Sequence, residues 1–398
     1  MSATLYFFGT GAMRPTISRN SIERNILNVN WYYTRSYPEA IPNYKLFSIG
    51  KINDIFITHL HGDHVSGLLN LVSSIGFDSL SMRPQPILNI YGPQGLYNFV
   101  TQMFTSRGAH PLCQLHIHEM VVDNYEPPVC PEEWQLLYSY TAIYPNQEGV
   151  YTVLSNQFIN VKATEIEHRG MTVGYVFEEV ERPGNIHMDT FKDVMDRMGQ
   201  YLLDTGDYTK RDIRQYCFNL ITRYKQGETL NLPNGQVVVY PDPKYISPPT
   251  SGRKIVILGD TCNPMPIASI ARNADVIVHE STVGPTLYDL YDDYNPKDMG
   301  SILEESSFDI RNNYKYLKIE AEAFNHKHST AFMAGEFAKE INASELILTH
   351  FSTKYSGESF YEKNDFMRDI EDIAKLGFQD QSVYAAYDGF IYSVSSKK

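Results

Sequence analysis

The chain is poor in cysteine, and the cysteines it has stand far apart. There are four, Cys113, Cys130, Cys217 and Cys262, and no two of them form a Cys-x-x-Cys pair. A zinc site built from thiolates needs such pairs, and a disulfide framework needs several cysteines in a short secreted chain. The sequence therefore indicates neither, and we interpret the cysteines as ordinary thiols.

Long apolar runs are also missing. No stretch approaches the roughly 20 consecutive apolar residues of a membrane helix, and the opening residues 1–6 lack the charged-then-apolar layout of a signal peptide. We find no internal repeat and no low-complexity tract. We expect a soluble, cytoplasmic protein that does not bind a membrane.

Positive charge is scarce. The 398 residues include 34 Lys and Arg against 47 Asp and Glu, which gives a net charge of −13. This argues against a protein that coats nucleic acid through bulk charge, although a local basic patch or a bound metal can override the total. The length allows two or three domains, or one large α/β or β-sandwich domain with an insertion. With 42% hydrophobic residues available for a core, an enzyme fits the composition best.

Four short apolar runs, rich in β-branched residues, each stop at a polar or ionisable residue. They are residues 55–58 before His59, 255–258 before Gly259 and Asp260, 276–278 before His279 and Glu280, and 346–349 before His350. Continuous runs of this length predict strands buried on both faces of a sheet. Helical patterns lie between them, at residues 67–74, 266–273 and 329–341. Because polar groups collect at the carboxyl ends of such strands, we expect the four ends to share one site.

The stretch His59-Leu-His61-Gly-Asp63-His64 places three imidazoles and a carboxylate directly after the first run. Neutral imidazole and carboxylate suit zinc, and Gly62 permits a tight turn that points them inward. One loop cannot complete two coordination shells, so we expect further ligands at the other strand ends. The candidates are Asp260, His279 and His350, together with His168, which follows the strand-like residues 161–167. A carboxylate is the natural bridge between two cations, which favours Asp260 for that role in a dinuclear site.

Residues 178–251 interrupt the rhythm of strands and helices and look like an insertion. The segment carries the turn signals Arg182-Pro-Gly and Pro233-Asn-Gly and a proline-rich stretch at 241–249. Within it, residues 208–226 have a local charge of +4, from Lys210, Arg211, Arg214, Arg223 and Lys225 against Asp212. Two interpretations stay open: a solvated helix face, or a contact for a phosphate backbone.

With several further stretches, these motifs resemble the metallo-β-lactamase superfamily and, within it, the tRNase Z (ribonuclease Z) group. The further stretches are Gly9-Thr-Gly-Ala with Pro15-Thr and Arg19-Asn20, Tyr91-Gly-Pro, Gly174-Tyr175 after His168, Gly259-Asp-Thr261, His279-Glu-Ser-Thr282, His328-Ser-Thr-Ala331, and Thr349-His-Phe-Ser352 with Tyr355. The histidine motif at 59–64 occurs across the superfamily. Together, the stretches at 279–282 and 328–331 point to the tRNase Z group.

This resemblance implies a fold, a set of metals and an oligomeric state. The implied fold is α/β, a four-layer αββα sandwich that forms a single domain over residues 1–398, with the insertion at 178–251 as an arm and a possible substrate-binding exosite. The implied cofactors are two Zn²⁺ per subunit, with Mn²⁺ as the other possibility, and the implied assembly is a homodimer. One domain is also favoured because the proposed ligands, spread from residue 59 to residue 350, must converge.

A role for each site residue follows from the same resemblance. It implies one zinc held by His59, His61 and His168, a second held by Asp63, His64 and His350, and Asp260 as the bridge. Asp63 would orient the attacking hydroxide, His328 would donate a proton to the departing ribose 3′-oxygen, and Glu280 would hold the ring of His328 in the required tautomer. His279 would support the site without being a ligand. His116 and His118 share one face of an expected strand but lack a following Asp-His, so they are left out of the metal set.

Two segments depart from the family. Where the family has Phe-Asp-Cys-Gly-Glu-Gly-Thr-Gln, residues 26–34 contain no acidic residue and no glycine, and Asn28 or Asn30 is the expected substitute. The usual Gly-Pro-rich tip of the arm is replaced by residues 198–204 and by the basic stretch at 208–226. The metal ligands themselves are unaffected.

Three functions remain in view. The leading hypothesis is a zinc-dependent endoribonuclease that cuts precursor tRNA on the 3′ side of the acceptor stem and leaves a 3′-hydroxyl. The alternative keeps the chemistry but changes the substrate to cyclic or other small nucleotides. A metal-free RNA-binding or scaffold protein is disfavoured because all the expected ligands are present.

Overall fold

In the computed structural model, the described residues are 3–7, 52–79, 87–105, 111–122, 125–126, 136–206, 209–232, 235–290, 309–353, 364–387 and 390–395. They divide into two compact units. The first contains Met1–Glu178 and Arg253–Ser395, and the second contains Glu179–Gly252. The motif residues 9–20, the departing segment 26–34, Cys130 and Tyr355 lie outside the described residues.

A sheet of four parallel strands forms one half of the first unit. Its strands lie in the order β2 (Asp54–Phe56), β3 (Ile87–Pro93), β4 (Gln114–Met120) and β5 (Tyr138–Ile143). Two helices, α2 (Leu68–Ser79) and α3 (Leu96–Thr105), cover one face of this sheet. Their buried side chains, among them Leu71 and Val100, pack with Ile55, Ile90 and Ile117 of the strands. Burying this apolar face removes it from water and fixes the helices on the sheet.

A larger sheet of seven strands forms the other half. In spatial order it contains β14 (Val383–Ala385), β13 (Leu346–Thr349), β12 (Val276–Glu280), β11 (Lys254–Ile257), β8 (Thr172–Glu179), β7 (Ile159–Ile166) and β6 (Val150–Ser155). The four strands from β11 to β14 run parallel to one another, and β11 is antiparallel to β8. The outer face is covered by α6 (Ala268–Ala271), α10 (Ala331–Glu340) and α11 (Asn364–Phe378), which bury residues such as Phe337 and Ile373 against it.

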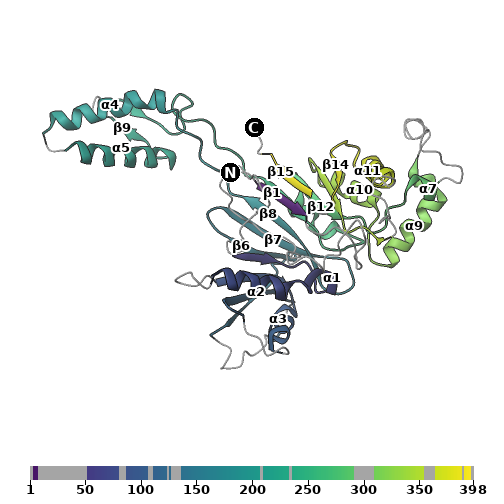
Figure 1. The fold of residues 1–398 in the computed structure, drawn as a ribbon. Coiled ribbons are helices and arrows are strands. Elements are labelled where there is room, and N and C mark those ends of the chain that lie inside the picture. Colours follow the sequence, from purple (N-terminus) through teal and green to yellow (C-terminus); the bar gives the residue numbers. More distant parts are fainter. Residues whose placement is uncertain are drawn as a thin grey trace. The chain divides into compact units, whose positions relative to one another are not determined.

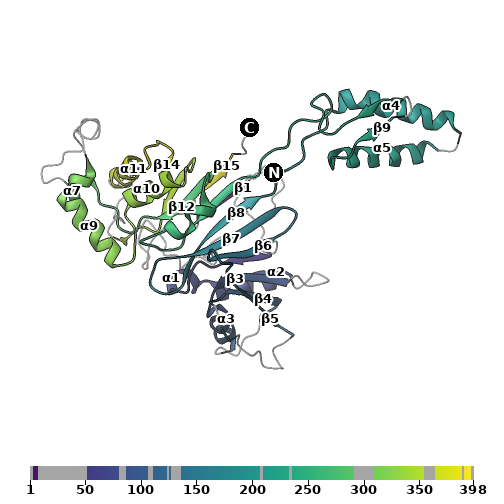
Figure 2. The same cartoon turned by 180° about the vertical axis from the view of Figure 1, so that it is seen from behind.

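The inner faces of the two sheets pack against each other. Their shared core contains Phe56 and Tyr91 from the small sheet and Val161, Tyr175 and Phe177 from the large one. Helices therefore lie outside each of two stacked sheets, as Figures 1 and 2 show for this unit. The predicted four-layer αββα sandwich is confirmed.

The four predicted apolar runs all form strands, but not in one sheet. Three of them become the neighbours β11, β12 and β13 of the large sheet, whereas the first becomes β2 of the small sheet. The end of β2 is tied to the large sheet by the Val173 amide, which donates to the Thr58 carbonyl at 2.9 Å, and by the Tyr175 hydroxyl, which donates to the Ile57 carbonyl at 2.7 Å. The shared site therefore lies where the ends of two sheets meet.

The predicted helices are present with shifted boundaries. The first, α2, begins at Leu68 and continues to Ser79. At 266–273 there is only a 3₁₀ turn, Met265–Ile267, followed by the four residues of α6. The third, α10, begins after the N-cap residue Thr330, whose side-chain oxygen accepts from the Met333 amide.

Remaining elements complete the first unit. β1 (Ala3–Phe7) and β15 (Phe390–Val394) pair antiparallel, so segments from both ends of the chain lie side by side. The others are α1 (Gly62–Val65), α7 (Leu287–Leu290), a 3₁₀ turn at Ile310–Asn312 and α9 (Tyr314–Asn325). In the part of the chain that the structure describes, no helix is long and apolar enough to cross a membrane.

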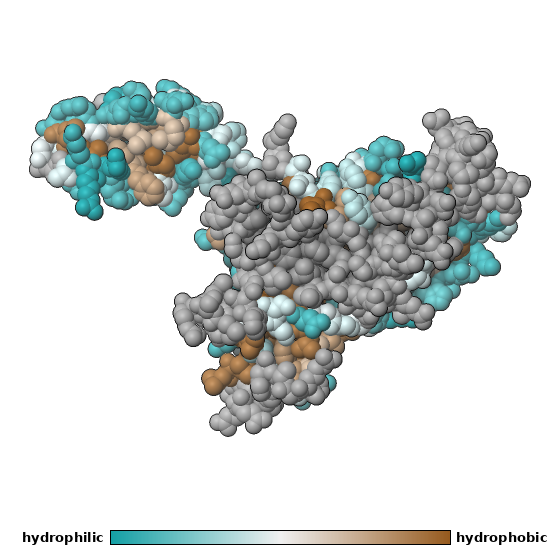
Figure 3. Space-filling view, in the orientation of Figure 1, coloured by the Kyte–Doolittle hydropathy of each residue, from teal (hydrophilic) through white to brown (hydrophobic). Residues whose placement is uncertain are grey.

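The second unit, which we call the arm, consists of two helices and a small hairpin. The helices are α4 (Met188–Asp204) and α5 (Lys210–Lys225), and the hairpin pairs β9 (Leu230–Asn231) with β10 (Val237–Val238). Phe191, Leu220 and Tyr224 belong to a separate apolar core within the arm. Figure 3 shows hydrophilic residues over much of its visible surface, with hydrophobic residues along the seam between the helices.

Candidate metal centre

The loop after β2 and the short helix α1 together carry four of the expected ligands. His59 and His61 precede α1, where His61 has an extended backbone and stands at the N-cap. Asp63 and His64 lie within the single turn of α1. The opposite wall approaches closely: a Cβ on Gly259 would lie only 2.8 Å from the Cβ of Thr58. Glycine at this position lets the end of β11, and with it Asp260, come against the histidine loop.

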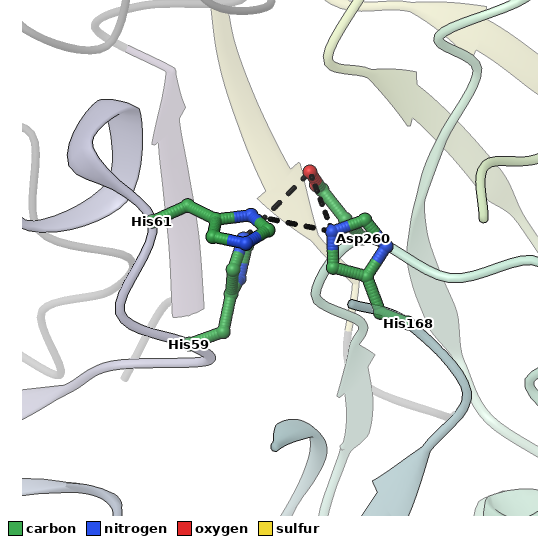
Figure 4. Close-up of side chains that lie close together, drawn as sticks. All are labelled: His59, His61, His168 and Asp260. Atoms are coloured by element: carbon green, nitrogen blue, oxygen red, sulfur yellow. Dashed lines mark hydrogen bonds and ion pairs between the residues drawn. The ribbon is translucent and has the colours of Figure 1, made fainter. Parts of the chain in front are cut away.

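The first group of donors comprises His59, His61, His168 and Asp260. Their ligand atoms all lie within 4.8 Å of one another, and Figure 4 shows the four side chains pointing toward a common point. His59 Nε2 lies 3.7 Å from Asp260 Oδ2, and His168 Nε2 lies 3.3 Å from His61 Nδ1. These side chains come from three segments, which follow β2, β7 and β11.

A second group comprises Asp63, His64 and His350. His64 Nε2 and His350 Nε2 are 3.3 Å apart, and His350 Nε2 lies 3.4 Å from Asp63 Oδ2. Asp260 reaches this group as well: its Oδ1 is 3.5 Å from His64 Nε2 and its Oδ2 is 3.3 Å from His350 Nε2. One buried carboxylate therefore contacts both groups, which is the arrangement that a bridging ligand requires.

The chemistry of these donors fits divalent metal ions. His59 Nε2 is buried and, among the described residues, has no hydrogen-bond partner. A buried polar atom without a hydrogen-bond partner costs free energy of folding. This nitrogen is therefore a candidate to bind a ligand. Imidazole nitrogens and carboxylate oxygens, the donor atoms of these groups, are the types that zinc takes in proteins.

Protonation states favour the same interpretation. Burial, aided by the neighbouring His64, lowers the pKa of His59 to about 2, so this ring stays neutral as a ligand must. For Asp63, burial acts to raise the pKa, but the hydrogen bond with His350 and the charges of His64 and His350 together outweigh it and hold the pKa below its usual range. For Asp260, His350 and His64 likewise overcome burial and lower the pKa. Both carboxylates are therefore ionised near neutral pH.

His350 shows how strongly the centre attracts positive charge. Burial acts to lower its pKa, yet the nearby Asp260 and the hydrogen bond with Asp63 raise the pKa to about 9. Without a cation, the ring therefore holds a proton at neutral pH. A metal ion bound here takes the place of that proton as the positive charge facing the carboxylates.

Several ligand rings are held through the nitrogen that faces away from the centre. His168 Nδ1 donates to the carbonyl of Lys327 at 2.6 Å, His350 Nδ1 lies 2.7 Å from the Thr282 hydroxyl, and His59 Nδ1 lies 3.2 Å from the Thr58 hydroxyl. Such contacts leave Nε2 as the ligand atom. Sequence reasoning assigned no role to Lys327 or Thr282, although both lie beside residues that it named.

His328 and Glu280 form a pair at the edge of the centre. His328 Nδ1 lies 3.1 Å from both carboxylate oxygens of Glu280 and 4.0 Å from Asp260 Oδ2. Glu280 is buried and also accepts from the Thr261 amide at 2.6 Å and from the Thr282 amide at 3.3 Å. Burial acts to lower the pKa of His328, but the hydrogen bond with Glu280 and the charges of Glu280 and Asp260 together outweigh it and raise the pKa.

His279 lies apart from the metal ligands. Successive residues of a strand point to opposite faces, so His279 of β12 points away from the side that Glu280 faces. Its ring packs against Phe337 of α10, with ring centroids 6.1 Å apart, and its Nδ1 donates to the Glu280 carbonyl at 2.8 Å. Any support it gives the site therefore passes through the backbone of Glu280.

The five basic residues named in the insertion all lie on α5 of the arm: Lys210, Arg211, Arg214, Arg223 and Lys225. The charge of Arg223 is offset by Glu228, whose Oε2 lies 2.6 Å from Arg223 Nε. Phe218 lies on the same helix and is 63% exposed. Arg211, Arg214 and Phe218 follow one another at spacings of three and four residues, so they share a helix face.

His116 and His118, which lie outside the metal set expected from the sequence, contact each other and other side chains. Their rings are neighbours on β4, with centroids 4.0 Å apart. His116 Nε2 lies 2.8 Å from the Thr141 hydroxyl, and His118 Nε2 lies 3.3 Å from the amide oxygen of Asn89. Among the described residues, neither belongs to a group of three or more donors that could hold a metal ion.

Several known proteins are similar to this chain in sequence. The model of the metallo-beta-lactamase superfamily matches residues 26–90. A protein named ribonuclease Z from Pediococcus pentosaceus is 29% identical over 392 residues, which is 96% of this chain and 97% of that protein. A protein from Bos taurus named zinc phosphodiesterase ELAC protein 1 is 26% identical over 421 residues and all of both chains.

A solved structure is similar in fold. The crystal structure of human tRNase Z, short form (ELAC1), superposes with a TM-score of 0.51 at 21% identity, covering 99% of this chain and 100% of that one. It has the same fold as the chain described above, and the family resemblance read from the motifs is confirmed.

Proposed function

We propose that this chain, a metallo-β-lactamase-fold protein similar to ribonuclease Z over nearly its whole length, is a zinc-dependent phosphodiesterase that removes the 3′ trailer of precursor tRNA and leaves a 3′-hydroxyl. The observation that carries the proposal is the meeting of two donor groups at Asp260, with the His328 and Glu280 pair beside them. Such a centre is suited to hydrolysis of a phosphodiester.

Two metal ions are proposed for each chain. His59, His61 and His168 would hold one, and Asp63, His64 and His350 the other, with Asp260 shared. Zinc is the favoured ion and manganese the other candidate. When bound, the ions supply Lewis-acid chemistry, which makes water a nucleophile near neutral pH and offsets negative charge on the phosphate.

The side chains themselves would place the water and move the proton. The ionised Asp63 accepts a hydrogen bond from the attacking water and aims it at phosphorus. As the water oxygen bonds to phosphorus, one proton of the water passes to Asp63, the bond from phosphorus to the ribose 3′-oxygen breaks, and the protonated His328 gives a proton to that oxygen. Glu280 accepts from His328 Nδ1, so Nε2 is the nitrogen left to donate. The tRNA then ends in a 3′-hydroxyl and the trailer begins with a 5′-phosphate.

The arm is proposed to bind the body of the tRNA. The exposed cations on α5 suit phosphate contacts, and Phe218 on the same face offers a surface for stacking. Small nucleotides are the alternative substrate, because the proposed chemistry needs a phosphodiester at the donor groups and no contact with the arm. For them, the arm would have no part in binding.

A cytoplasmic homodimer is proposed from the family resemblance alone. Sedimentation equilibrium tests the assembly: a mass near twice the 45.6 kDa of the chain is expected. A mass equal to one chain at micromolar concentration would remove the dimer.

Cleavage of an end-labelled precursor tRNA tests the function. Protein with two equivalents of zinc should release the trailer as one product with a 5′-phosphate, and chelation with EDTA should abolish the reaction. Bis(p-nitrophenyl) phosphate is measured in parallel. Hydrolysis of that compound or of a cyclic nucleotide, without any tRNA product, would assign the small-nucleotide function, whereas no turnover of any of them would remove both.

A further inference from the structure

We propose that Thr282 is a positioning residue, whose single hydroxyl sets the orientation of the metal ligand His350 and at the same time braces Glu280 against His328. Its oxygen lies 2.7 Å from His350 Nδ1 and is hydrogen-bonded to Glu280 Oε2. Glu280 in turn contacts His328 Nδ1 at 3.1 Å. One oxygen atom therefore joins a ligand of the metal centre to the proton donor at its edge. The inference rests on the proposed metal centre, not on the identity of the RNA.

The direction of each hydrogen bond follows from what each group can donate. Glu280 is a carboxylate that already accepts from the amides of Thr261 and Thr282, and it has no proton to offer. The only proton of the Thr282 hydroxyl must then point at Glu280. His350 Nδ1 is left to donate its own proton to the Thr282 oxygen.

This direction decides which nitrogen of His350 can bind a cation. With Nδ1 carrying the proton, the lone pair of the neutral ring is on Nε2. That nitrogen is the one that lies 3.3 Å from Asp260 and 3.4 Å from Asp63. Thr282 therefore selects the tautomer that presents a ligand atom to the centre, and rejects the tautomer that would present a proton.

The backbone around Thr282 holds the hydroxyl in place. The Thr282 amide donates to Glu280, its carbonyl accepts from the Ser352 amide at 3.2 Å, and the next residue, Val283, forms a bridge with Thr330. His350 has a left-handed backbone with φ 58°, directly after β13. The backbone thus holds Thr282 and His350 in place without the hydroxyl. Replacing the Thr282 hydroxyl by a methyl group should therefore remove its hydrogen bonds to Glu280 and His350 and leave the surrounding backbone unchanged.

Zinc affinity tests the proposal without any substrate. Thr282→Val and Thr282→Ala remove the hydroxyl with and without its volume, and Thr282→Ser restores it. The control is Thr164→Val on β7, because the Thr164 hydroxyl is buried and has no hydrogen-bond partner among the described residues. Zinc is titrated into metal-free protein in competition with a chromogenic chelator, and the melting temperature of the metal-free protein is recorded for every variant.

The valine and alanine variants should bind zinc about 10- to 100-fold more weakly, the loss typical when the partner of a metal-bound histidine is removed. The serine variant and Thr164→Val should bind it within about threefold of the parent. Weakened binding in the serine variant as well, or unchanged affinity in both hydroxyl-free variants, would overturn the proposal. If precursor tRNA is not cut, the proposed substrate fails while these affinities still decide the role of Thr282.

Discussion

The carbonyl oxygen of Lys327 accepts a hydrogen bond from His168 Nδ1 at 2.6 Å, and Lys327 adopts a left-handed backbone, with φ 64°, to place it there. A second contact joins the same segments, because Lys327 Nζ lies 2.7 Å from Glu167, the residue before His168. These two contacts hold the loop that precedes α10 against the loop that follows β7. The next residue along the chain is His328, so one backbone turn positions both His168, a proposed metal ligand, and the proposed proton donor.

Substitutions at Lys327 should separate the carbonyl from the side chain. Lys327→Gly keeps the left-handed turn without strain, whereas Lys327→Val strains the turn further because a β-branched residue resists a positive φ more than lysine does. We expect the glycine variant to bind zinc like the parent and the valine variant to bind it at least severalfold more weakly. Asn342→Val is the control, since Asn342 has φ 52° and belongs to none of the donor groups. It should lower the melting temperature but not the zinc affinity. Equal zinc affinity in both Lys327 variants would contradict the claim that the Lys327 turn positions His168.

Removing the shared carboxylate should disturb both metals at once. In Asp260→Asn, the charge that faces both donor groups is lost and one bridging oxygen becomes an amide nitrogen. We expect fewer than two zinc ions per chain by elemental analysis after dialysis, and hydrolysis of bis(p-nitrophenyl) phosphate close to background.

Asp275→Asn provides the matched control for that variant. Asp275 is also a buried carboxylate, directly before β12 of the large sheet, and it accepts from the Lys254 amide at 2.7 Å. An asparagine there keeps an acceptor, so zinc content and turnover should match the parent. Two tightly bound zinc ions in Asp260→Asn would show that Asp260 is not a bridge.

His328 should matter only when the leaving group needs a proton. A ribose 3′-oxygen leaves as a strong base, whereas p-nitrophenolate leaves without protonation. We therefore expect His328→Ala to slow cleavage of precursor tRNA by about 10²- to 10⁴-fold and to change hydrolysis of bis(p-nitrophenyl) phosphate much less. His326→Ala, an exposed histidine of the same loop, should affect neither. A parallel loss on both substrates would assign His328 to metal binding or packing instead.

Neutralising the arm should change binding and not chemistry. In the triple variant Lys210→Gln, Arg211→Gln, Arg214→Gln, the slope of log affinity against log salt should fall by about 0.9 for every phosphate that is no longer neutralised. Turnover of bis(p-nitrophenyl) phosphate should stay unchanged.

The control for the arm removes basic residues that already have partners. Arg197 lies 2.6 Å from Asp193 and Arg223 lies 2.6 Å from Glu228. The double variant Arg197→Gln, Arg223→Gln should therefore keep most of the salt dependence. If the triple variant binds precursor tRNA with the salt dependence of the parent, the arm takes no part in RNA binding and a small-nucleotide substrate is favoured.

The stability of the metal-free protein should fall as the pH rises from 6.5 to 9. The pKa of His350 is about 9 in the folded chain against an ordinary 6.5, so its proton stabilises the fold fully below 6.5 and is lost as the pH approaches 9. The loss is on the order of 3 kcal/mol, and the raised pKa of His328 acts in the same direction. His59, with its pKa near 2 in the folded chain, is neutral there throughout this window and adds only a small opposite slope near pH 6.5, where the unfolded ring still titrates.

Urea unfolding in EDTA at several pH values measures this effect. His350→Gln removes the titrating ring and should flatten the curve between pH 6.5 and 9. With zinc bound the trend should reverse, because metal binding then competes with fewer protons at higher pH. A metal-free parent whose stability is flat or rises over this window would contradict the proposed field around His350.

Much of the proposed centre could be predicted from the sequence, because most of its residues stand in short local patterns. The pattern His59-Leu-His61-Gly-Asp63-His64 after an apolar run identifies the loop, and the runs that end at Asp260 and His350 identify two further strand ends. Strand and helix periodicity arises from backbone geometry, so the pattern can be recognised in a single sequence. The αββα fold itself came from the family resemblance of these motifs.

Other features were decided only by the tertiary structure. Whether β2 joins β11 in one sheet or faces it from another depends on how the apolar faces of two sheets pack, and no local pattern states that. The same packing brings Thr282 to His350 and Lys327 to His168, through a hydroxyl and a backbone carbonyl that carry no signature of their own. It also decides which face of β12 meets the centre, so that Glu280 points toward it and the adjacent His279, on the opposite face, packs against Phe337. Sequence determines which groups are available for chemistry, and long-range packing determines which of them meet.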